Sequence, residues 1–349
     1  CAQLAAVSLP NTLASISRSA FYDCTGLTEI SLPSSLTSMG EYAFRGTGLK
    51  SVTIPGSLTS IPDHAFAACA DLSSVTISNG VTSIGQYAFN KCTGLATVSL
   101  PNSLASIDMS AFYDCAGLSE ISLHSSLTSM GEYAFLGTGL KSVAIPSSLT
   151  SIAAYAFALC AELTSTTIPS SVTSIEEGAF YGCSKLASIT LPDKLQSIGL
   201  VAFYDCEKIT SVNIPHSVTD IADGAFGHCS SLAEITACAE SQSFTAASGV
   251  LFSKEMTQIV CFPAGKGETE YDIPNSVTNI QGSTFEGCTR LTSVTIPNSV
   301  TIIGQSAFWE CEGLTAITLP ENVERIDTVA FYGCSGLKDI FSINTTPPT

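Results

Sequence analysis

Cysteines are the side chains of this sequence best suited to chemistry, because a thiolate can act as a nucleophile, bind a metal or form a disulfide. The chain has 14 cysteines in 349 residues. Twelve of them occupy one position of a recurring sequence unit, namely residues 1, 24, 69, 92, 115, 160, 183, 206, 229, 288, 311 and 334. Such regularity indicates a structural position rather than a single reactive centre.

No arrangement typical of catalysis or metal binding accompanies the cysteines. The sequence has no C-x-x-C pair, no G-x-S-x-G, no P-loop and no G-x-G-x-x-G motif. The four histidines, at 64, 124, 216 and 228, fall at different positions of the repeat and form no cluster. Glu176 and Glu177 could form an acid pair, but acids recur at this position in other units. The sequence therefore predicts no enzyme activity, no catalytic residue, no metal site and no cofactor.

Phenylalanines follow the same period, mostly within the dipeptide Ala-Phe. They fall at 21, 44, 66, 89, 112, 135, 157, 180, 203, 226, 285, 308 and 331, mostly at steps of 22 or 23 residues. Aligned on them, the unit is C-x-x-L-x-x-V-x-L-P-x-x-L-x-x-I-x-x-x-A-F-x-x. A short period kept over so many copies predicts a solenoid, in which each coil buries its apolar side on its neighbours.

The first half of the unit predicts a strand. In the copy that begins at position 24, Ile30 and Leu32 alternate with Glu29 and Ser31, which is typical of a strand with one buried face. Pro33 ends this strand, because proline cannot donate the next ladder hydrogen bond. One strand per coil gives a continuous parallel sheet.

The second half of the unit predicts a turn and a short helical segment. Leu36 and Met39 fit a second short extended or turn segment. Residues 40–44 predict a brief helical turn, with Glu41 near its N-terminus, where the partial positive charge favours an acid. The expected fold is an α/β solenoid of about 15 coils of 22–23 residues. Its sheet would line the concave face, and turns or helical turns would form the convex side.

One segment breaks the repeat. The interval between Phe226 and Phe285 is longer than two units, and two apolar runs at 248–252 and 258–262 are separated by Ser-Lys-Glu-Met-Thr, which predicts a β-hairpin. The predicted organisation is regular repeats at 1–236, an irregular hairpin-bearing unit at 237–271, regular repeats at 272–341 and an exit tail at 342–349.

The repeat resembles the BspA-like, or Treponema-type, class of leucine-rich repeats. The resemblance rests on the proline after the strand and on Ala-Phe followed by Cys or Asn, and it covers nearly the whole chain. The irregular unit, with its Gly-Val-Leu-Phe and Pro-Ala-Gly-Lys runs, is also similar to units of that class. The resemblance implies a right-handed coil and a role in adhesion to host matrix proteins or in contact between cells.

The cysteine row is expected to hold buried free thiols. Parallel side chains on successive coils lie about 4.8 Å apart, whereas a disulfide needs Cβ atoms about 3.8 Å apart. Parallel ligands also do not converge on a tetrahedral metal site. Cys238 and Cys261 lie outside the row, in the irregular unit, where a bond between them stays open.

The strand positions that face away from the core are the predicted ligand-binding surface. Ser and Thr fill most of them, either because short side chains fit a curved sheet or because rows of hydroxyls recognise a ligand. An acidic, hydroxyl-lined groove would favour a basic or polar partner. The candidate ligand-binding residues are Glu29, Ser31, Ser51, Thr53, Glu120, Ser122, Asn213, Glu234, Asp339 and Phe341.

The net charge of the chain limits the classes of partner that are expected. With 13 basic and 30 acidic residues, the formal charge is −17, which repels phosphate backbones and anionic lipids. No apolar stretch of about 18 residues predicts a membrane span. Nucleic acid and membrane insertion are therefore not expected, and a protein of the host matrix or cell surface, or a glycan, is.

The leading hypothesis is a non-catalytic binding or adhesion module of a cell-surface or secreted protein. An intracellular interaction scaffold is the alternative, because reduced cysteines suit a reducing compartment. A third hypothesis treats the Ser and Thr rows as an ice- or crystal-binding array, which requires a flat sheet.

Overall fold

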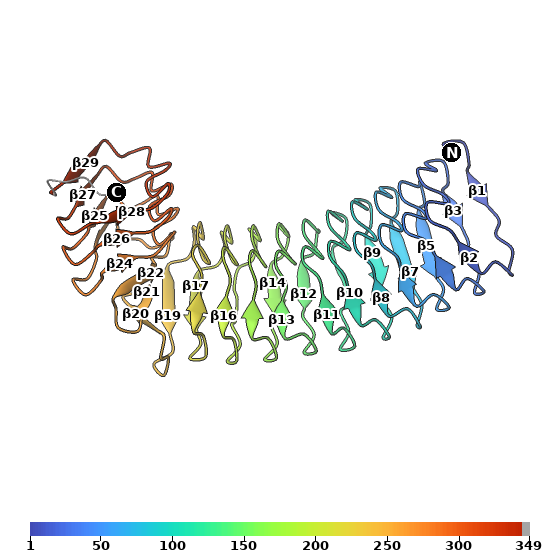
Figure 1. Ribbon diagram of the computed structural model, residues 1–349, viewed down its shortest axis with the longest axis horizontal. Coiled ribbons are helices and arrows are strands. Elements are labelled where there is room, and N and C mark those ends of the chain that lie inside the picture. The colour runs from blue at the N-terminus through green and yellow to red at the C-terminus, as the bar shows by residue number, and fades with distance from the viewer. Residues whose placement is uncertain (344–349) are drawn as a thin grey trace. The chain divides into compact units, whose positions relative to one another are not determined.

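The computed structural model describes residues 1–343 as a leucine-rich repeat solenoid of about 15 turns (Figure 1). It divides into two compact units, residues 1–172 and 173–349, which are described separately. Every regular element in residues 1–343 is a short strand. Of the exit tail predicted at 342–349, only residues 342 and 343 are among those described.

In the first unit, a first ladder of parallel strands follows the Leu-x-x-Val segment of each coil. Val52 and Ile54 point into the core, with 4% and 0% exposure, while Ser51 and Thr53 point outward. Neighbouring strands pair with equivalent residues opposite each other, for example Ser51 with Ser74. The strands are β1 (Ala6–Val7), β3 (Glu29–Ile30), β5 (Ser51–Ile54), β7 (Ser74–Ile77), β9 (Thr97–Ser99), β12 (Ser142–Ala144) and β14 (Ser165–Thr167).

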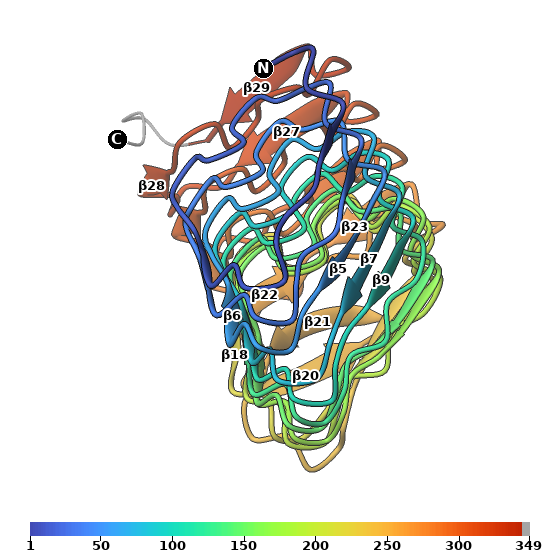
Figure 2. The same ribbon diagram turned by 90° about the vertical axis from the view of Figure 1, so that its right-hand side faces the viewer.

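A second ladder follows the Ser-Ile or Ser-Met segment of each coil, as the spacing of Leu36 and Met39 predicts. Figure 2 shows β5, β7 and β9 along one flank of the coils and β6 along the opposite flank. The strands are β2 (Ser15–Ile16), β4 (Ser38–Met39), β6 (Ser60–Ile61), β8 (Ser83–Ile84), β10 (Ser106–Ile107), β11 (Ser129–Met130) and β13 (Ser151–Ile152).

The prediction of one continuous sheet is wrong. In the first unit both ladders break at the 22-residue steps, and the first ladder also breaks at residues 120–122, which form no strand. Every paired step there joins residues 23 apart, such as Ala6 with Glu29 and Ser106 with Ser129. At the first 22-residue step, β3 does not pair with β5 and β4 does not pair with β6. At the second, β11 does not pair with β13. The missing residue falls directly before Leu49 and Leu140, so the amides that follow are displaced from the register that the other strands share.

The second unit has the same two ladders. Its first ladder has a gap at residues 188–191, which form no strand. Its first-ladder strands are β17 (Ser211–Ile214), β19 (Glu234–Ala237), β23 (Glu270–Asp272), β25 (Ser293–Thr295), β27 (Ala316–Leu319) and β29 (Asp339–Ser342). Its second-ladder strands are β15 (Ser174–Ile175), β16 (Ser197–Ile198), β18 (Asp220–Ile221), β22 (Gln258–Cys261), β24 (Asn279–Ile280), β26 (Ile302–Ile303) and β28 (Arg325–Ile326).

The predicted helical turn at the Ala-Phe segment is also wrong, because backbone amides there bond to the next coil. Tyr42, Phe44 and Gly46 donate to carbonyls 21 residues ahead at 3.1, 2.8 and 2.8 Å, whereas an α-helix would turn these amides inward to carbonyls four residues back. The chain achieves this by placing Tyr42 and Gly46 at φ 59° and 68°, in the left-handed region. Alternation of right- and left-handed residues gives consecutive tight turns instead of a helix.

The phenylalanines of these turns stack on one another; in the second unit the stacked rings form two runs, Phe180 to Phe226 and Phe262 to Phe331. In the first unit, neighbouring ring centroids lie 5.1 to 5.6 Å apart with nearly parallel planes. Most of these rings, including Phe112 and Phe135, have no exposed surface. Stacked aromatic pairs contribute about 0.5–1.5 kcal/mol beyond the area they bury. This stack is the centre of the core on the turn side.

The thiol row lies beside the phenylalanine stack, and the described cysteines of the row form no disulfide. Most buried thiols of the row reach the carbonyl oxygen of a phenylalanine in the preceding coil; Cys92 and Cys115 do so at 3.1 Å. Thr47 and Thr138 replace cysteine where the coil shortens, and their hydroxyls donate to the carbonyl oxygens of Phe44 and Phe135 at 2.9 Å. The row therefore satisfies carbonyl groups inside the solenoid.

The irregular unit adds an antiparallel sheet to the second unit. Strand β20 (Phe244–Ala247) pairs with β21 (Val250–Ser253) through a two-residue turn at Ser248 and Gly249, both with positive φ. Strand β21 then pairs with β22, as the predicted hairpin requires, and β22 joins β24 in parallel. Within the second unit, Figure 1 shows the coils of β24, β26 and β28 stacked along a different direction from those of β16, β17 and β19.

Truncating one ring of the stack should destabilise the first unit. We expect Phe135→Ala to lower the free energy of unfolding by about 3–5 kcal/mol, because a fully buried ring leaves a cavity. Glu29→Gln, at an exposed first-ladder position, should change it by less than about 0.5 kcal/mol. Urea denaturation followed by circular dichroism measures both changes. A loss of less than about 1 kcal/mol in Phe135→Ala would mean that the stack contributes little to stability.

Thiol reactivity should divide the cysteines by burial. Burial raises the pKa of Cys160 to about 11 and that of Cys261 to about 12, so neither thiolate forms near neutral pH. We expect iodoacetamide at pH 8 to modify Cys1, which is exposed, and Cys238, which is half-buried, before any of the buried row. Peptide mass spectrometry locates the labels, and labelling in urea is the control. Early labelling of Cys160 in the folded protein would contradict its burial.

Candidate ligand-binding site

The best-ordered part of the first ladder is a patch of six hydroxyl side chains on β5, β7 and β9. Paired registers place them in two rows, and none of the six hydroxyls hydrogen bonds within residues 1–343. Threonines elsewhere on the coils differ, since Thr82 donates to the Thr59 carbonyl oxygen at 3.0 Å. We call this patch the hydroxyl face, and it consists of Ser51, Thr53, Ser74, Thr76, Thr97 and Ser99.

The predicted residues Glu29 and Ser31 are exposed at one end of the first unit. Together with Ala6 and Asn11, among others, they line a shallow hollow of about 380 Å³. Glu120 and Ser122 are exposed four coils further along, in a segment that forms no strand. The structure therefore does not bring the two predicted acids of this unit together.

In the second unit, the structure brings Asn213 and Glu234 together on the paired strands β17 and β19. The Thr236 hydroxyl donates to Asn213 Oδ1 at 2.9 Å, so that acceptor is already occupied. Asp339 and Phe341 share the terminal strand β29, where the Phe341 side chain is 56% exposed. These residues are accessible, but the two pairs lie on different strands and do not form a single site.

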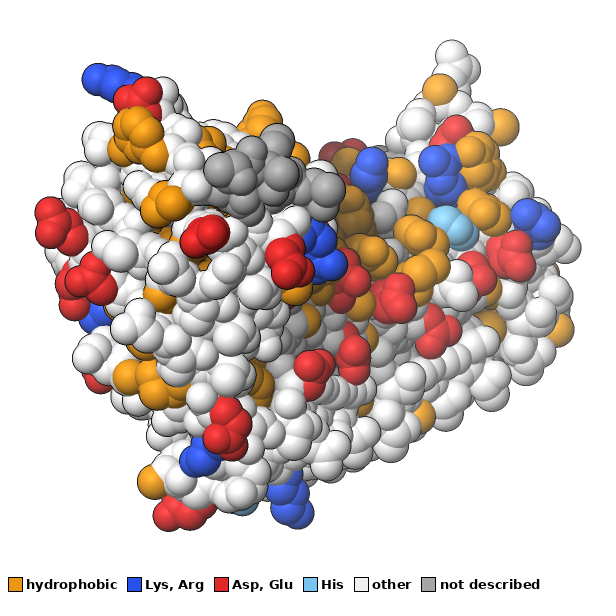
Figure 3. All heavy atoms as spheres, turned by 60° about the vertical axis from the view of Figure 1, so that its left-hand side comes forward, with side chains coloured by type: hydrophobic (Ala, Val, Ile, Leu, Met, Phe, Trp, Pro, Cys, Tyr) orange, Lys and Arg blue, Asp and Glu red, His pale blue; other side chains and the backbone are white. Residues whose placement is uncertain are grey.

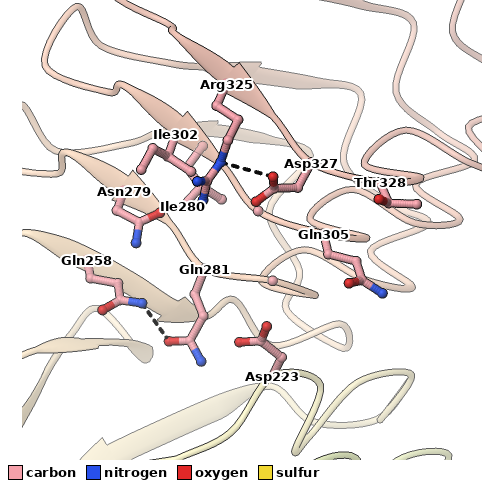
Figure 4. A pocket seen from close by; sticks show the side chains of 12 residues that line it. Asp223, Gln258, Asn279, Ile280, Gln281, Ile302, Gln305, Arg325, Asp327 and Thr328 are labelled. Carbon is pink, nitrogen blue, oxygen red and sulfur yellow. Dashed lines mark hydrogen bonds and ion pairs between the residues drawn. The ribbon is translucent and has the colours of Figure 1, made fainter. Parts of the chain in front are cut away.

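A polar pocket that the sequence did not predict lies next to the irregular unit, with a volume of about 490 Å³. Five residues of the second ladder (on β22, β24, β26 and β28), the residues that follow β24, β26 and β28, and Asp223 line it (Figure 4). We call it the amide pocket; its polar lining side chains are Asp223, Gln258, Asn279, Gln281, Gln305, Arg325, Asp327 and Thr328. The coils from Ser15 to Ser197 carry serine at the same second-ladder position and the next coil carries Asp220, so this change was the available sequence signal.

Hydrogen bonds fix one side of the amide pocket. Gln258 Nε2 donates to Gln281 Oε1 at 3.0 Å, and Gln281 Nε2 donates to the Ile221 carbonyl oxygen at 3.1 Å. The second bond joins coils 60 residues apart, because the irregular unit supplies a strand there but no Ala-Phe turn. Arg325 Nε pairs with Asp327 Oδ1 at 3.0 Å across the pocket (Figure 4).

A buried acid cluster lies on the turn side of the same junction. Glu286 is 7% exposed, and its Oε1 accepts a 2.8 Å hydrogen bond from the Tyr204 hydroxyl. His228 Nε2 lies 3.8 Å from Glu286 Oε1 and 3.6 Å from Glu310 Oε2. Burial raises the pKa of Glu286, against the opposing effect of its hydrogen bonds and of His228. Within residues 1–343, no group of His, Cys, Asp and Glu has the arrangement of a metal site.

Comparison with known proteins agrees with this architecture. The family described as the BspA type leucine rich repeat region matches residues 1–115, 59–183, 150–263 and 260–346, in six copies. The chain belongs to the BspA-type leucine-rich repeat family. This confirms the resemblance inferred from the repeat unit. No curated protein matches the chain.

Two solved structures illustrate the relationship. A leucine-rich repeat protein from Bacteroides ovatus ATCC 8483 is 28% identical, with a TM-score of 0.64 over 96% of this chain and 76% of that one. A leucine rich cell surface protein from Faecalibacterium prausnitzii A2-165 is 24% identical, with a TM-score of 0.51 over 98% of this chain and 88% of that one. The second likeness shows the fold alone.

Membership of the BspA-type family limits the kinds of activity to be considered for this chain. Leucine-rich repeat proteins bind proteins, and the family is generally non-catalytic. Among residues 1–343 no helix is long and apolar enough to cross a membrane. Figure 3 shows one face of this BspA-type chain, largely uncharged, with more acidic than basic side chains. A surface of this kind favours polar or basic partners over anionic ones.

The buried acid cluster should make stability depend on pH. The raised pKa of Glu286 means that the folded state keeps this proton to a higher pH than the unfolded state does. Its stabilising contribution is full below the unfolded pKa of about 4.3 and is lost as the pH rises through the folded pKa. Glu286→Gln stays neutral and keeps an acceptor for Tyr204, so we expect it to be more stable than the wild type at pH 7 and equal at pH 4.

Urea denaturation from pH 4 to pH 7 measures this difference. Glu312→Gln is the matched control, because Glu312 is exposed on a neighbouring turn. A Glu286→Gln variant that is less stable than the wild type at pH 7 would mean that the charged carboxylate, through His228, stabilises the fold.

Proposed function

We propose that this chain is a non-catalytic binding module of a cell-surface or secreted protein and that the outward side of its first ladder holds a protein ligand. The observation that carries the proposal is the hydroxyl face, where three paired strands present six unbonded hydroxyls in two rows. The sequence predicts Ser51 and Thr53 as members of this surface.

The geometry of the hydroxyl face suits an extended polar ligand. Hydroxyls can both donate and accept, so each row offers hydrogen bonds at the coil spacing of about 4.8 Å. The side chains are short and attached to a hydrogen-bonded ladder, so binding orders few rotamers and costs little entropy. The net charge of −17 adds attraction for basic segments of a protein partner.

A pair of arginine substitutions tests this face. Thr53→Arg with Thr76→Arg would place two long cations in the middle of the rows, so we expect at least a tenfold weaker affinity for a protein ligand. Surface plasmon resonance against extracellular-matrix proteins and mucin-type glycans measures it. Ser60→Arg with Ser83→Arg is the matched control, because these residues lie on the second ladder of the same coils (Figure 2).

Two results would count against the proposal. Equal loss in both double variants would move the binding surface away from the first ladder. Failure of every extracellular ligand, together with specific binding of a cytosolic protein by the purified chain, would favour the intracellular scaffold instead.

A further inference from the structure

We infer that the amide pocket and an adjoining aromatic hollow form one groove that binds a neutral oligosaccharide. This function is separate from the proposed protein-binding face on the first ladder. The groove lies on the second ladder and the turns of the second unit, where the regular serine row ends.

The two hollows adjoin each other. The amide pocket, of about 490 Å³, and the second hollow, of about 380 Å³, share Asp223 and Gln305 in their walls. Their combined length runs from the second ladder at Asn279 to the turns at Trp309. A groove of this extent accommodates more than one sugar ring, since ligand pockets typically measure about 300–1,000 Å³.

Glycines keep the floor of the groove open. A Cβ on Gly282 would lie 2.3 Å from Asp223 Oδ2, and one on Gly304 would lie 2.6 Å from the Gly282 amide nitrogen. The coil at Gln281 and Gly282 also reverses the order of the Gly-Gln pair found at 304 and 305. The backbone thus approaches the pocket closely, and Asp223 is held over it.

The amide part of the groove offers donors and acceptors without a net positive charge. The Asn279 and Gln305 side chains form no hydrogen bond within residues 1–343, and Gln305 is exposed. Figure 4 shows both amides, with Asp223 and Thr328, around the same hollow. Amides and carboxylates match sugar hydroxyls, which donate and accept at once. Arg325 is already paired with Asp327, so an anionic ligand would face the unpaired Asp223.

The aromatic part supplies flat surfaces. Tyr181 and Tyr204 stack at 5.3 Å and line the second hollow together with Trp309. Tyr204 is held by its hydrogen bond to Glu286, and Trp309 packs on Tyr332 with ring centroids 4.4 Å apart. Half-buried aromatic rings beside fixed polar groups provide an apolar face and oriented hydrogen bonds. Sugar rings carry both kinds of surface.

Trp309 is the only tryptophan of the chain, so its fluorescence reports on this groove directly. We expect at least one neutral oligosaccharide, from a panel of glucose, galactose, mannose, xylose and N-acetylglucosamine hexamers, to change this fluorescence saturably. Asn279→Asp and Gln305→Glu, which keep shape but replace amide donors with a charge, should each weaken binding at least tenfold. Isothermal titration calorimetry with the same sugar confirms the affinities.

Controls separate this groove from the first ladder and from misfolding. Asn102→Asp, at an exposed loop position in the first unit, should leave sugar affinity unchanged, and so should Thr53→Arg with Thr76→Arg. Matching thermal unfolding curves show that each variant is folded. No saturable response to any hexamer at about 10 mM, where a Kd of 1 mM would give near-saturation, would overturn the inference. Binding that persists in both Asn279→Asp and Gln305→Glu, or binding of acidic sugars alone, would also overturn it.

Discussion

Backbone hydrogen bonds that point from each coil to the next are the constraint on which this solenoid depends. At the Ala-Phe turn, every second amide donates forward, and the donors on either side of the phenylalanine, such as Tyr42 and Gly46, adopt the left-handed conformation. These turns hold the phenylalanine rings one above another, and the thiols bond to the carbonyls that remain. Core, turns and thiol row thus satisfy one requirement, that no polar backbone group is left unpaired between coils.

The same constraint explains why coil length matters more than composition. In the first unit, the turn ladder continues across a 22-residue step, with Phe44 bonded to the Ala65 carbonyl oxygen at 2.8 Å. The strand ladders do not continue there, because the lost residue shifts the following amides relative to the previous coil. The same interruption therefore occurs twice in the first unit, once at each 22-residue step.

Periodicity allowed the repeat, the buried rows and the outward positions to be predicted, because each follows from residue spacing alone. Spacing does not distinguish a helical turn from alternating right- and left-handed turns: Gly40 to Phe44 fits both, and only the forward hydrogen bonds decide between them. The amide pocket escaped prediction for another reason. Its walls come from coils 60 residues apart that meet only because the irregular unit supplies a strand without a turn.

The junction between these coils lowers the stability of the fold, and the residues responsible lie at the candidate groove. The coils up to residue 197 keep Ser at the outward second-ladder position, whereas Gln258, Asn279 and Arg325 occupy it in and after the irregular unit. On the turn side, the junction buries Glu286 beside His228, and burial raises the pKa of that carboxyl. A buried carboxyl opposes stability, and a regular coil would avoid it. The buried carboxyl and the unbonded amides are concentrated at this one junction, in a chain otherwise built from repeated serines and threonines. Stacking between coils does not by itself explain why these residues lie there.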